Sequence, residues 1–393
     1  MADHAVTAGF IPLLDASILI VARELGFANA EGIDLRLVRE TSWANIRDRM
    51  AIGHFDVAHM LAPMPIAANL GLTPFAMTMI APMALGLGGN AITISANLAA
   101  AMGDFPGARK ANEAGKLLRN AIAVRDRTGK TKLKFGVVHP HSSHNFELRY
   151  WLIACGIAPD RDVEIVILPP PFMVDALIQG DLDGYCVGEP WNSLAVEKGA
   201  GRILTTKQAI WASSPEKVLG VAEKWAEQHR DELAALLSAF YRAAQWCGDA
   251  ANRAEHAALL AETRYLGLDA AVIAAALGGE AHFEPFDKAA TFPWQSHALW
   301  FYSQMVRWNH VRHLPQHADI ARRTYRPDIY RAAIGTAGGV VPAASAKVEG
   351  ALVRPTAVGT TGGMLTLGPD GFFDGKIFDP DRLDDYLSNQ VKN

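Results

Sequence analysis

The chain has 393 residues, of which half are hydrophobic and 20% are charged, and its formal net charge is -4 at pH 7. That length exceeds what one compact core usually holds and suits two lobes. The slight acidic excess leaves no basic surplus to neutralise phosphates, which argues against nucleic acid as a direct partner.

The cysteines and the apolar segments indicate in which cellular compartment the protein works. Cys155, Cys186 and Cys247 form no Cys-x-x-Cys pair, so we interpret them as reduced, buried thiols in a reducing environment. The start of the chain has neither a basic stretch before an unbroken apolar run nor a lipobox cysteine, which predicts a cytoplasmic protein. Prolines and glycines interrupt the apolar residues 65–89, so we expect no membrane-spanning helix.

The first sixty residues alternate between strands and helices. We predict strands at Ala5–Phe10, Ile33–Val38 and Val57–Met60, and helices at Asp15–Leu25 and Trp43–Ile52. This order predicts a parallel sheet covered by helices.

The middle of the chain repeats that order. We predict strands at Lys134–Val138, Val163–Leu168 and Gly184–Val187, and helices at His144–Cys155 and Met173–Gln179. Residues 53–56 (Gly-His-Phe-Asp) and 180–183 (Gly-Asp-Leu-Asp) each end a helix and start a strand. This weak echo favours a duplicated architecture.

Beyond residue 213 the pattern changes to long helices. We expect them within Glu223–Trp246, Ala251–Ala276 and Ala298–Trp308. Residues 337–366 are rich in Gly, Ala, Thr and Val and read as an extended segment, and Asp379–Leu387 predicts a last short helix.

These elements predict an α/β clamshell of two lobes, each a mostly parallel sheet flanked by helices. Crossings near residues 91 and 189 divide it into 1–91 (first part of lobe I), 92–189 (lobe II), 190–336 (the helix-rich return to lobe I) and 337–393 (a C-terminal wrap on the lobes). The ligand of such a fold lies between the lobes, at the carboxyl ends of the strands and the amino ends of the helices.

Two predicted helix starts carry candidate site residues. Trp43 follows Thr41-Ser42, and its indole either covers a flat ligand and donates its N–H, or packs in the core. In the run from His139 to His144, Ser142 or Ser143 would cap a helix whose free N–H groups suit an anion. His144 then contacts an anion or is a satisfied loop residue. A metal is the weaker alternative, because no carboxylate or cysteine stands nearby to complete a shell.

Residues 213–217 predict a third helix start, with Pro215 at its first position. Lys217 would lie in the first turn, where the helix dipole disfavours a cation unless an anionic ligand reverses the penalty. The alternative is a solvated lysine beside Glu216. Glu189 and Pro190, near the expected second crossing, are either a hinge or a wall of the site. Gly86, Gly88 and Gly89 would let the backbone before Asn90 approach a ligand.

Catalytic motifs are missing from the sequence. It has no Gly-x-Ser-x-Gly, Walker or His-Glu-x-x-His motif, and no dinucleotide fingerprint in a strand–helix setting. We therefore expect a protein that is not an enzyme and has no cofactor, and we keep a histidine-using synthase on the same scaffold as a minor hypothesis.

Several segments together resemble a known family. They are Gly9-Phe10-Ile11-Pro12-Leu13, Thr41-Ser42-Trp43, Ala62-Pro63-Met64-Pro65, Arg149-Tyr150-Trp151-Leu152, Pro169-Pro170-Pro171, Cys186-Val187-Gly188-Glu189-Pro190-Trp191-Asn192, Pro215-Glu216-Lys217, Gln245-Trp246-Cys247 and Phe372-Phe373-Asp374-Gly375. Over nearly its whole length the chain resembles the nitrate/bicarbonate-binding proteins of the type II periplasmic-binding-protein-like superfamily, and among them the cytoplasmic nitrate/nitrite sensors of the NasS type.

The resemblance implies a ligand set for a small inorganic anion. A tryptophan, a side-chain amide, a histidine and a lysine hold the anion in that family, and they fall on Trp43, Asn90, His144 and Lys217. The amide is usually glutamine, so Asn90 is a departure. Nitrate accepts hydrogen bonds and donates none, which suits converging donors, whereas the hydroxyl of bicarbonate needs an acceptor such as Glu189.

The resemblance also implies a function. We expect a cytoplasmic nitrate/nitrite sensor in which ligand-driven closure of the lobes releases an antiterminator partner of the ANTAR type. The alternative is the solute-binding component of an ABC-type transporter for nitrate, nitrite or bicarbonate.

Overall fold

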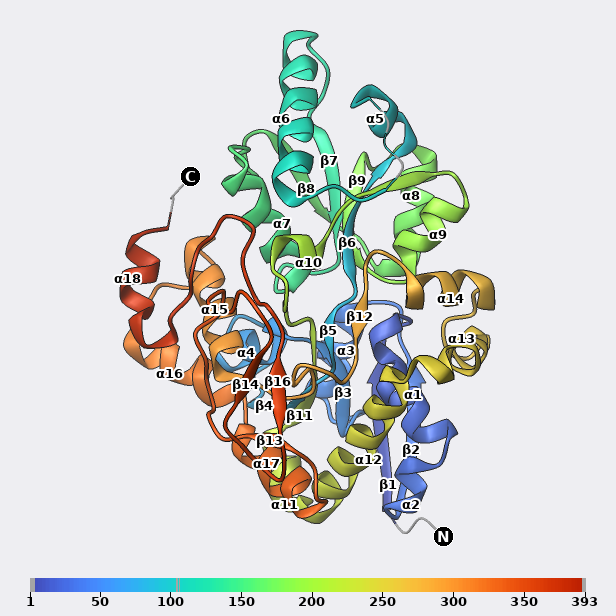
Figure 1. The fold of residues 1–393 in the computed structure, drawn as a ribbon, viewed down its shortest axis with the longest axis vertical. Helices are drawn as coiled ribbons and strands as arrows, with labels where there is room; N and C mark the ends of the chain where they lie inside the picture. The colour runs from blue at the N-terminus through green and yellow to red at the C-terminus, as the bar shows by residue number, and fades with distance from the viewer. Residues whose placement is uncertain (1–3, 104, 106, 391–393) are drawn as a thin grey trace.

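The computed structural model describes residues 4–103, 105 and 107–390. Two lobes lie one above the other along the long axis, each built on a five-stranded sheet with helices on its faces (Figure 1). The N-terminus lies at the free end of one lobe, here lobe I, and the chain passes from it into lobe II and back. The predicted two-lobed α/β architecture is confirmed.

The sheet of lobe I has a central strand that is buried along its whole length. In spatial order its strands are β2 (Ile33–Arg39), β1 (His4–Phe10), β3 (Val57–Leu61), β11 (Lys217–Ala222) and β4 (Met79–Ala84). β1 pairs in parallel with β2 and β3, whereas β11 is antiparallel to β3 and β4. All five residues of β3 are buried, as expected of a strand covered on both faces.

The sheet of lobe II has the same organisation. Its strands, in spatial order, are β10 (Gly201–Thr206), β6 (Asn90–Ser95), β9 (Gly184–Gly188), β7 (Leu133–Val137) and β8 (Val163–Ile167). β7 pairs in parallel with β8 and β9, whereas β6 is antiparallel to β9 and β10. Each sheet is therefore mixed: four of its strands run in one direction, and the one reversed strand is the strand that enters from the other lobe.

The sequence echo has a structural counterpart. Asp56 and Asp183 each precede a strand, and each carboxylate accepts a backbone N–H from the first parallel strand of its own sheet. The donors are Thr7 N and Lys134 N, each at 2.8 Å. The two short motifs therefore do the same work, which is to tie a helix–strand turn to the neighbouring strand.

The second crossing lies further along the chain than residue 189. β10 is hydrogen-bonded to β6, so residues 190–206 remain in lobe II and the chain returns through residues 207–216. The helix predicted to start at 213–217 is also wrong. Lys217–Ala222 has every residue but the last buried and pairs with two strands, so sheet pairing overrides the local Ser-Pro-Glu start signal. The helix begins six residues later, at Glu223.

The first crossing contains the three glycines that were expected to face a ligand. Gly86, Gly88 and Gly89 have positive φ angles of 101°, 72° and 79°. They pack against residues 282–284 instead, where β5 (Leu87–Gly88) pairs with β12 (Phe283–Glu284). Their conformational freedom therefore serves a tight crossing rather than a ligand.

Helices cover both sheets. In lobe I they are α1 (Ser17–Glu24), α2 (Phe27–Ala30), α3 (Trp43–Ala51), α4 (Pro63–Asn69), α11 (Glu223–Gln228), α12 (Arg230–Gly248), α13 (Arg253–Ala261), α14 (Ala270–Gly278), α15 (Gln295–Arg307), α16 (Pro315–Thr324) and α17 (Pro327–Thr336). In lobe II they are α5 (Ala96–Ala101), α6 (Ala111–Arg127), α7 (Ser143–Ala154), α8 (Met173–Gln179) and α9 (Trp191–Glu197), and α10 (Lys207–Ile210) lies in the return crossing. Short 3-10 turns lie at Leu14–Ala16, Pro170–Phe172, Ala250–Asn252 and Pro380–Arg382.

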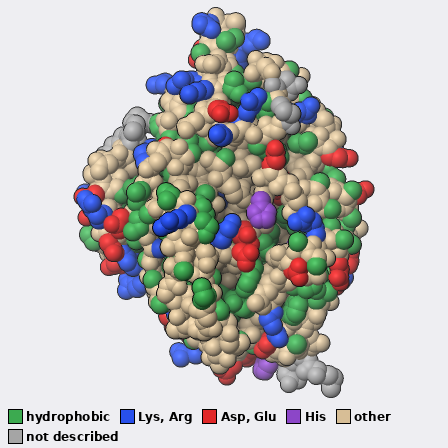
Figure 2. Space-filling view, in the orientation of Figure 1, with side chains coloured by type: hydrophobic (Ala, Val, Ile, Leu, Met, Phe, Trp, Pro, Cys, Tyr) green, Lys and Arg blue, Asp and Glu red, His purple; other side chains and the backbone are tan. Residues whose placement is uncertain are grey.

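The long α12 packs against α1, α2 and α17, and its buried residues include Leu236, Leu237 and Phe240. In the part of the chain that the structure describes, none of the helices combines the length and the apolar character needed to cross a membrane. On the face shown in Figure 2, basic and acidic side chains are interspersed rather than gathered by sign.

The C-terminal segment runs over both lobes. It contains β13 (Val341–Pro342), β14 (Thr356–Val358), β15 (Thr360–Thr361), β16 (Leu365–Leu367) and α18 (Leu383–Ser388). β13 pairs with β15 and β14 with β16. In lobe II, Tyr150 Oη donates to Asp374 Oδ1 at 2.8 Å, and Ser213 Oγ of the return crossing donates to Pro369 O at 2.8 Å. The tail therefore holds the return crossing against α7.

Candidate functional site

The reversed strands, β6 in lobe II and β11 in lobe I, begin at equivalent edges of their sheets. Asn90 is the first residue of β6 and pairs with Gly188, the last residue of β9. Lys217 is the first residue of β11 and pairs with Leu61, the last residue of β3. Both residues therefore lie at the edge where the parallel strands of their lobe end, which is where a ligand of such a fold binds.

Matching helix starts bring two more candidate residues to these edges. Ser42 Oγ accepts from Asn45 N at 3.2 Å and caps α3, whose first residue is Trp43. Ser142 Oγ accepts from Asn145 N at 3.0 Å and caps α7, whose second residue is His144. The predicted serine cap of α7 is confirmed.

The structure brings four of the six candidate residues together. Trp43 and Lys217 come from lobe I, and Asn90 and His144 from lobe II. The exposed fraction is 1% for Trp43 and 0% for the other three. The Lys217 ammonium lies 5.5 Å from the centroid of the Trp43 ring, within the range of a cation–π contact.

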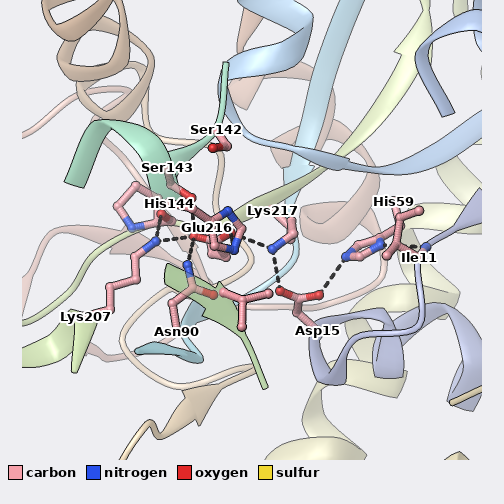
Figure 3. A network of polar contacts seen from close by, with 12 residues as sticks. Ile11, Asp15, His59, Asn90, Ser142, Ser143, His144, Lys207, Glu216 and Lys217 are labelled. Carbon is pink, nitrogen blue, oxygen red and sulfur yellow. Dashed lines mark hydrogen bonds and ion pairs between the residues drawn. The ribbon is translucent and has the colours of Figure 1, made fainter. Parts of the chain in front are cut away.

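Glu216 occupies the centre of this cluster (Figure 3). Its Oε2 accepts from Asn90 Nδ2 at 2.6 Å and also from the Ser143 hydroxyl and the Lys207 ammonium. Its Oε1 accepts from Lys217 Nζ at 2.5 Å. Burial opposes ionisation, but the adjacent ammonium groups of Lys207 and Lys217 hold the pKa of Glu216 well below its ordinary value.

Lys217 continues a chain of polar contacts into lobe I (Figure 3). Its ammonium donates to Asp15 Oδ2 at 2.7 Å, and Asp15 Oδ1 lies 2.8 Å from His59 Nε2. His59 Nδ1 accepts from Ile11 N at 3.5 Å, so the ring proton is on Nε2 and points at Asp15. Burial alone would raise the pKa of Asp15, but Lys217 and His59 lower it below its ordinary value. Lys217 is therefore held between two ionised carboxylates at the start of a strand, not in the first turn of a helix.

A second lysine supports the other side of Glu216. Lys207 Nζ donates to Pro215 O at 2.7 Å and lies 3.2 Å from Glu147 Oε1. Burial would lower the pKa of Lys207, but Glu147 and Glu216 raise it, so the ammonium stays charged. Burial raises the pKa of Glu147 to about 7, and its carboxyl also accepts the Ser214 hydroxyl.

Several polar atoms of the cluster have no hydrogen-bond partner among the described residues, although they are buried. They are Trp43 Nε1, both ring nitrogens of His144, and Asn90 Oδ1. His144 Nε2 lies 3.3 Å from Glu216 Oε1 without the geometry of a hydrogen bond. Burial lowers the pKa of His144 to about 3, so the ring is neutral, with one donor and one acceptor nitrogen. Buried donors without a partner are rare in proteins and call for a ligand or a water molecule.

Glu189 and Pro190 do not join this cluster. The carboxylate of Glu189 accepts from Ser193 N at 3.0 Å and from Ser193 Oγ at 3.1 Å, so both of its oxygens are used in the first turn of α9. Burial raises the pKa of Glu189 to about 7. Its carbonyl accepts from Leu14 N of lobe I at 2.8 Å. Its own helix therefore satisfies the carboxylate, and the residue joins the lobes through its backbone, which favours the hinge over the wall of the site among the two alternatives for Glu189.

The histidine-rich loop does not form a metal site in the described part of the chain. His139 Nδ1 accepts from His141 N at 3.0 Å, and the His141 ring packs against His310 with 5.0 Å between centroids. Within residues 4–103, 105 and 107–390, no three His, Cys, Asp or Glu side chains are grouped so as to hold a metal ion. All three cysteines are free, and only Cys186 is fully buried.

Sequence reasoning missed the residues that organise the charges, namely Asp15, His59, Glu147 and Lys207, and gave Glu216 no role of its own. Asp15 carried a signal, because a carboxylate inside the apolar run from Phe10 to Ala22 must find a partner once buried. No feature of the sequence marked Lys207 as buried, since a lysine after a strand is usually solvated.

Comparison with known proteins supports the architecture. The NMT1-like family matches residues 2–261. The nitrate/nitrite binding protein NrtA of Nostoc is 31% identical over 97% of this chain and 84% of its own length. The crystal structure of the periplasmic nitrate-binding protein NrtA from Synechocystis superimposes with a TM-score of 0.84, at 26% identity over 98% of both chains.

A further relative is a longer protein. The nitrate import ATP-binding protein NrtC of Synechocystis is 36% identical over 82% of this chain, and the chain spans only 48% of its length. The shared fold, the match to NrtA over 97% of this chain and the family match agree with one another. This chain therefore belongs to the NMT1-like family and is a relative of the nitrate/nitrite-binding proteins.

Proposed function

We propose that this protein is a receptor for a small monovalent oxyanion, nitrate or nitrite, which binds where the two lobes meet. One observation carries the proposal. The unpartnered Trp43 N–H and the unpartnered His144 ring come from opposite lobes and lie beside the Lys217 ammonium, all of them buried. An acceptor-only anion is the ligand whose chemistry matches buried donors and a cation.

The relatives support a role in transport. NrtA is named as a nitrate/nitrite binding protein, and NrtC as a nitrate import ATP-binding protein. We therefore favour a solute-binding component that delivers the anion to an ABC-type permease over the sensor expected from the sequence. The cytoplasmic location and the ANTAR-type antiterminator partner stay predictions from the family resemblance, and fractionation of native cells checks the location.

Bicarbonate is the competing ligand. Another relative is named as a bicarbonate transport ATP-binding protein, at 34% identity over 83% of this chain. The buried Asn90 Oδ1 is an acceptor without a partner, which the hydroxyl of bicarbonate or a water molecule would satisfy and nitrate would not. The unpartnered N–H groups of Trp43 and His144 are accompanied by the Lys217 ammonium, and NrtA is named as a nitrate/nitrite binding protein, so we rank nitrate and nitrite first and include bicarbonate in the titrations.

Replacement of Trp43 by Phe tests the proposal by calorimetric titration with nitrate, nitrite, bicarbonate and sulfate. Trp43 Nε1 has no hydrogen-bond partner within residues 4–103, 105 and 107–390, so Trp43→Phe removes no hydrogen bond among them. A hydrogen bond to a charged group contributes about 1.5–3 kcal/mol, so nitrate affinity should fall roughly ten- to a hundred-fold while the melting temperature changes little.

Trp151→Phe is the matched control. Trp151 Nε1 donates to Ala111 O at 2.9 Å inside lobe II, away from the cluster. This variant should lose about 1 kcal/mol of stability and keep its nitrate affinity. If both variants bind nitrate as the wild type does, or if the wild type binds none of the four anions, the proposal fails.

A further inference from the structure

The Glu216 carboxylate stands where the donors of the cluster converge. Asn90, Ser143 and Lys207 donate to its Oε2, and Lys217 donates to its Oε1, with His144 Nε2 at 3.3 Å from that same oxygen. Three of the four residues proposed to hold the anion therefore already contact a carboxylate of the protein itself (Figure 3).

A carboxylate and a nitrate ion are alike in the features that these donors recognise. Both are planar, delocalised monoanions whose oxygens accept hydrogen bonds from ammonium, amide and imidazole groups. Oε1 faces Lys217 and His144, whereas Oε2 faces Asn90, Ser143 and Lys207. The part of Glu216 that coincides with the proposed anion position is therefore Oε1.

The positive charge of the cluster is already shared among carboxylates. Lys217 contacts Asp15 and Glu216, and Lys207 contacts Glu147 and Glu216. A further anion placed beside an undisturbed Glu216 would face a like charge in a buried site, where such repulsion is strong. An inorganic anion thus has to take over contacts that Glu216 now makes.

We propose that Glu216 is an internal counter-anion that sets the affinity of the site, and that the inorganic anion binds by replacing Oε1 of Glu216 at Lys217 and His144. Lys207 and Ser143 retain the carboxylate through Oε2 while this exchange takes place. The inference rests on the proposed anion receptor and adds a residue that opposes binding. Removal of Glu216 should therefore strengthen binding, whereas removal of Trp43, His144 or Lys217 should weaken it.

Glu216→Gln tests the inference by nitrate titration in chloride-free buffer. Gln keeps the shape of the side chain and removes its charge, so nitrate should bind at least about tenfold tighter than in the wild type. Without nitrate the variant should melt at a lower temperature than the wild type, because Lys207 and Lys217 lose a counter-charge, and nitrate should raise its melting temperature by more.

A second variant and a control keep the outcome clear. Glu216→Asp retains the charge but shortens its reach to Lys217, and it too should bind nitrate more tightly than the wild type. Glu349→Gln is the control, since Glu349 is an equally buried carboxylate that contacts Lys347, His297 and Ser296 away from the site. Its nitrate affinity should equal that of the wild type.

The results separate the two proposals. Nitrate binding by the wild type that neither Glu216 variant strengthens would overturn the counter-anion role and leave the receptor standing. No nitrate binding by the wild type or by either Glu216 variant would overturn both.

Discussion

Two buried clusters of this protein have nearly the same composition and lie in different parts of the fold. In one, Glu216 contacts lysines, a serine and a histidine at the junction of the lobes. In the other, Glu349 contacts Lys347, Ser296 and His297, where the C-terminal segment meets α15. The same side chains therefore serve two purposes, and their place in the fold decides which.

The difference between the clusters lies in what surrounds them. The Glu216 cluster takes its residues from both lobes, at strand ends, and includes the Asn90 amide and the unpartnered Trp43 N–H. The Glu349 cluster joins residues of the tail to one helix, with Lys347 Nζ also donating to Asp370 Oδ2 at 2.8 Å. We infer that the first binds a ligand and that the second fastens the tail.

The largest expected effect comes from replacing one lysine of each cluster, Lys217 or Lys347, by methionine. Lys217→Met should lower nitrate affinity by roughly three orders of magnitude, because a unit charge about 4 Å away contributes about 4 kcal/mol at an effective dielectric of 20. Lys347→Met should leave affinity unchanged and expose the C-terminal segment to protease. Calorimetry measures the affinity of both variants, and limited proteolysis measures how exposed the C-terminal segment is. If Lys217→Met bound nitrate as tightly as the wild type, the two clusters would not differ in ligand binding.

A smaller effect concerns stability and pH at the tail cluster. Burial alone would raise the pKa of Glu349, but Lys347 and His297 lower it to about 2. A carboxyl with a lowered folded-state pKa stabilises the fold above its ordinary pKa and loses that contribution as the pH falls towards the folded value. Glu349→Gln should therefore cost about 3 kcal/mol at pH 7, and the difference from the wild type should shrink below about pH 4.5.

Urea unfolding of both proteins at several pH values measures this difference. Saturating nitrate should stabilise Glu349→Gln and the wild type equally, since the tail cluster lies outside the anion site. A difference that stays constant down to pH 3.5 would show that the ion pair of Glu349 has no part in it.

The smallest effect compares the two histidines. His144→Ala should weaken nitrate binding roughly ten- to a hundred-fold, the loss of one hydrogen bond to a charged ligand. Because burial lowers the pKa of His144 to about 3, the loss of affinity in His144→Ala should be the same at pH 5 and at pH 8. His297→Ala should change stability and leave affinity alone. A tenfold loss of affinity in His297→Ala, measured by calorimetry, would contradict the comparison.

The sequence predicted the two lobes and the elements that hold the site residues, but it did not predict how the charged side chains of the site pair. Strand and helix order predicted three of the five strands of each sheet, and local serine caps placed Trp43 and His144 at helix starts. Lys217 was found through a family resemblance, and its predicted helix was wrong because pairing of β11 with β3 and β4 is a long-range effect that local signals do not encode.

The partners of Lys217 could not be predicted for the same reason. Asp15 is 202 residues away from Lys217 in the chain, and Asn90 is 126 residues away from Glu216. Glu189 looked like a site residue because of its acidic side chain beside Pro190 and Trp191, yet the N–H and hydroxyl of Ser193, only four residues on, use both carboxylate oxygens.

A crystal structure of the wild-type protein with nitrate tests the central claim most directly. We expect nitrate between the lobes, in contact with Trp43 Nε1, a ring nitrogen of His144 and the Lys217 ammonium, with Glu216 Oε1 turned away from that lysine. Nitrate bound elsewhere, or bound while Glu216 still contacts both Lys217 and Lys207, would contradict it.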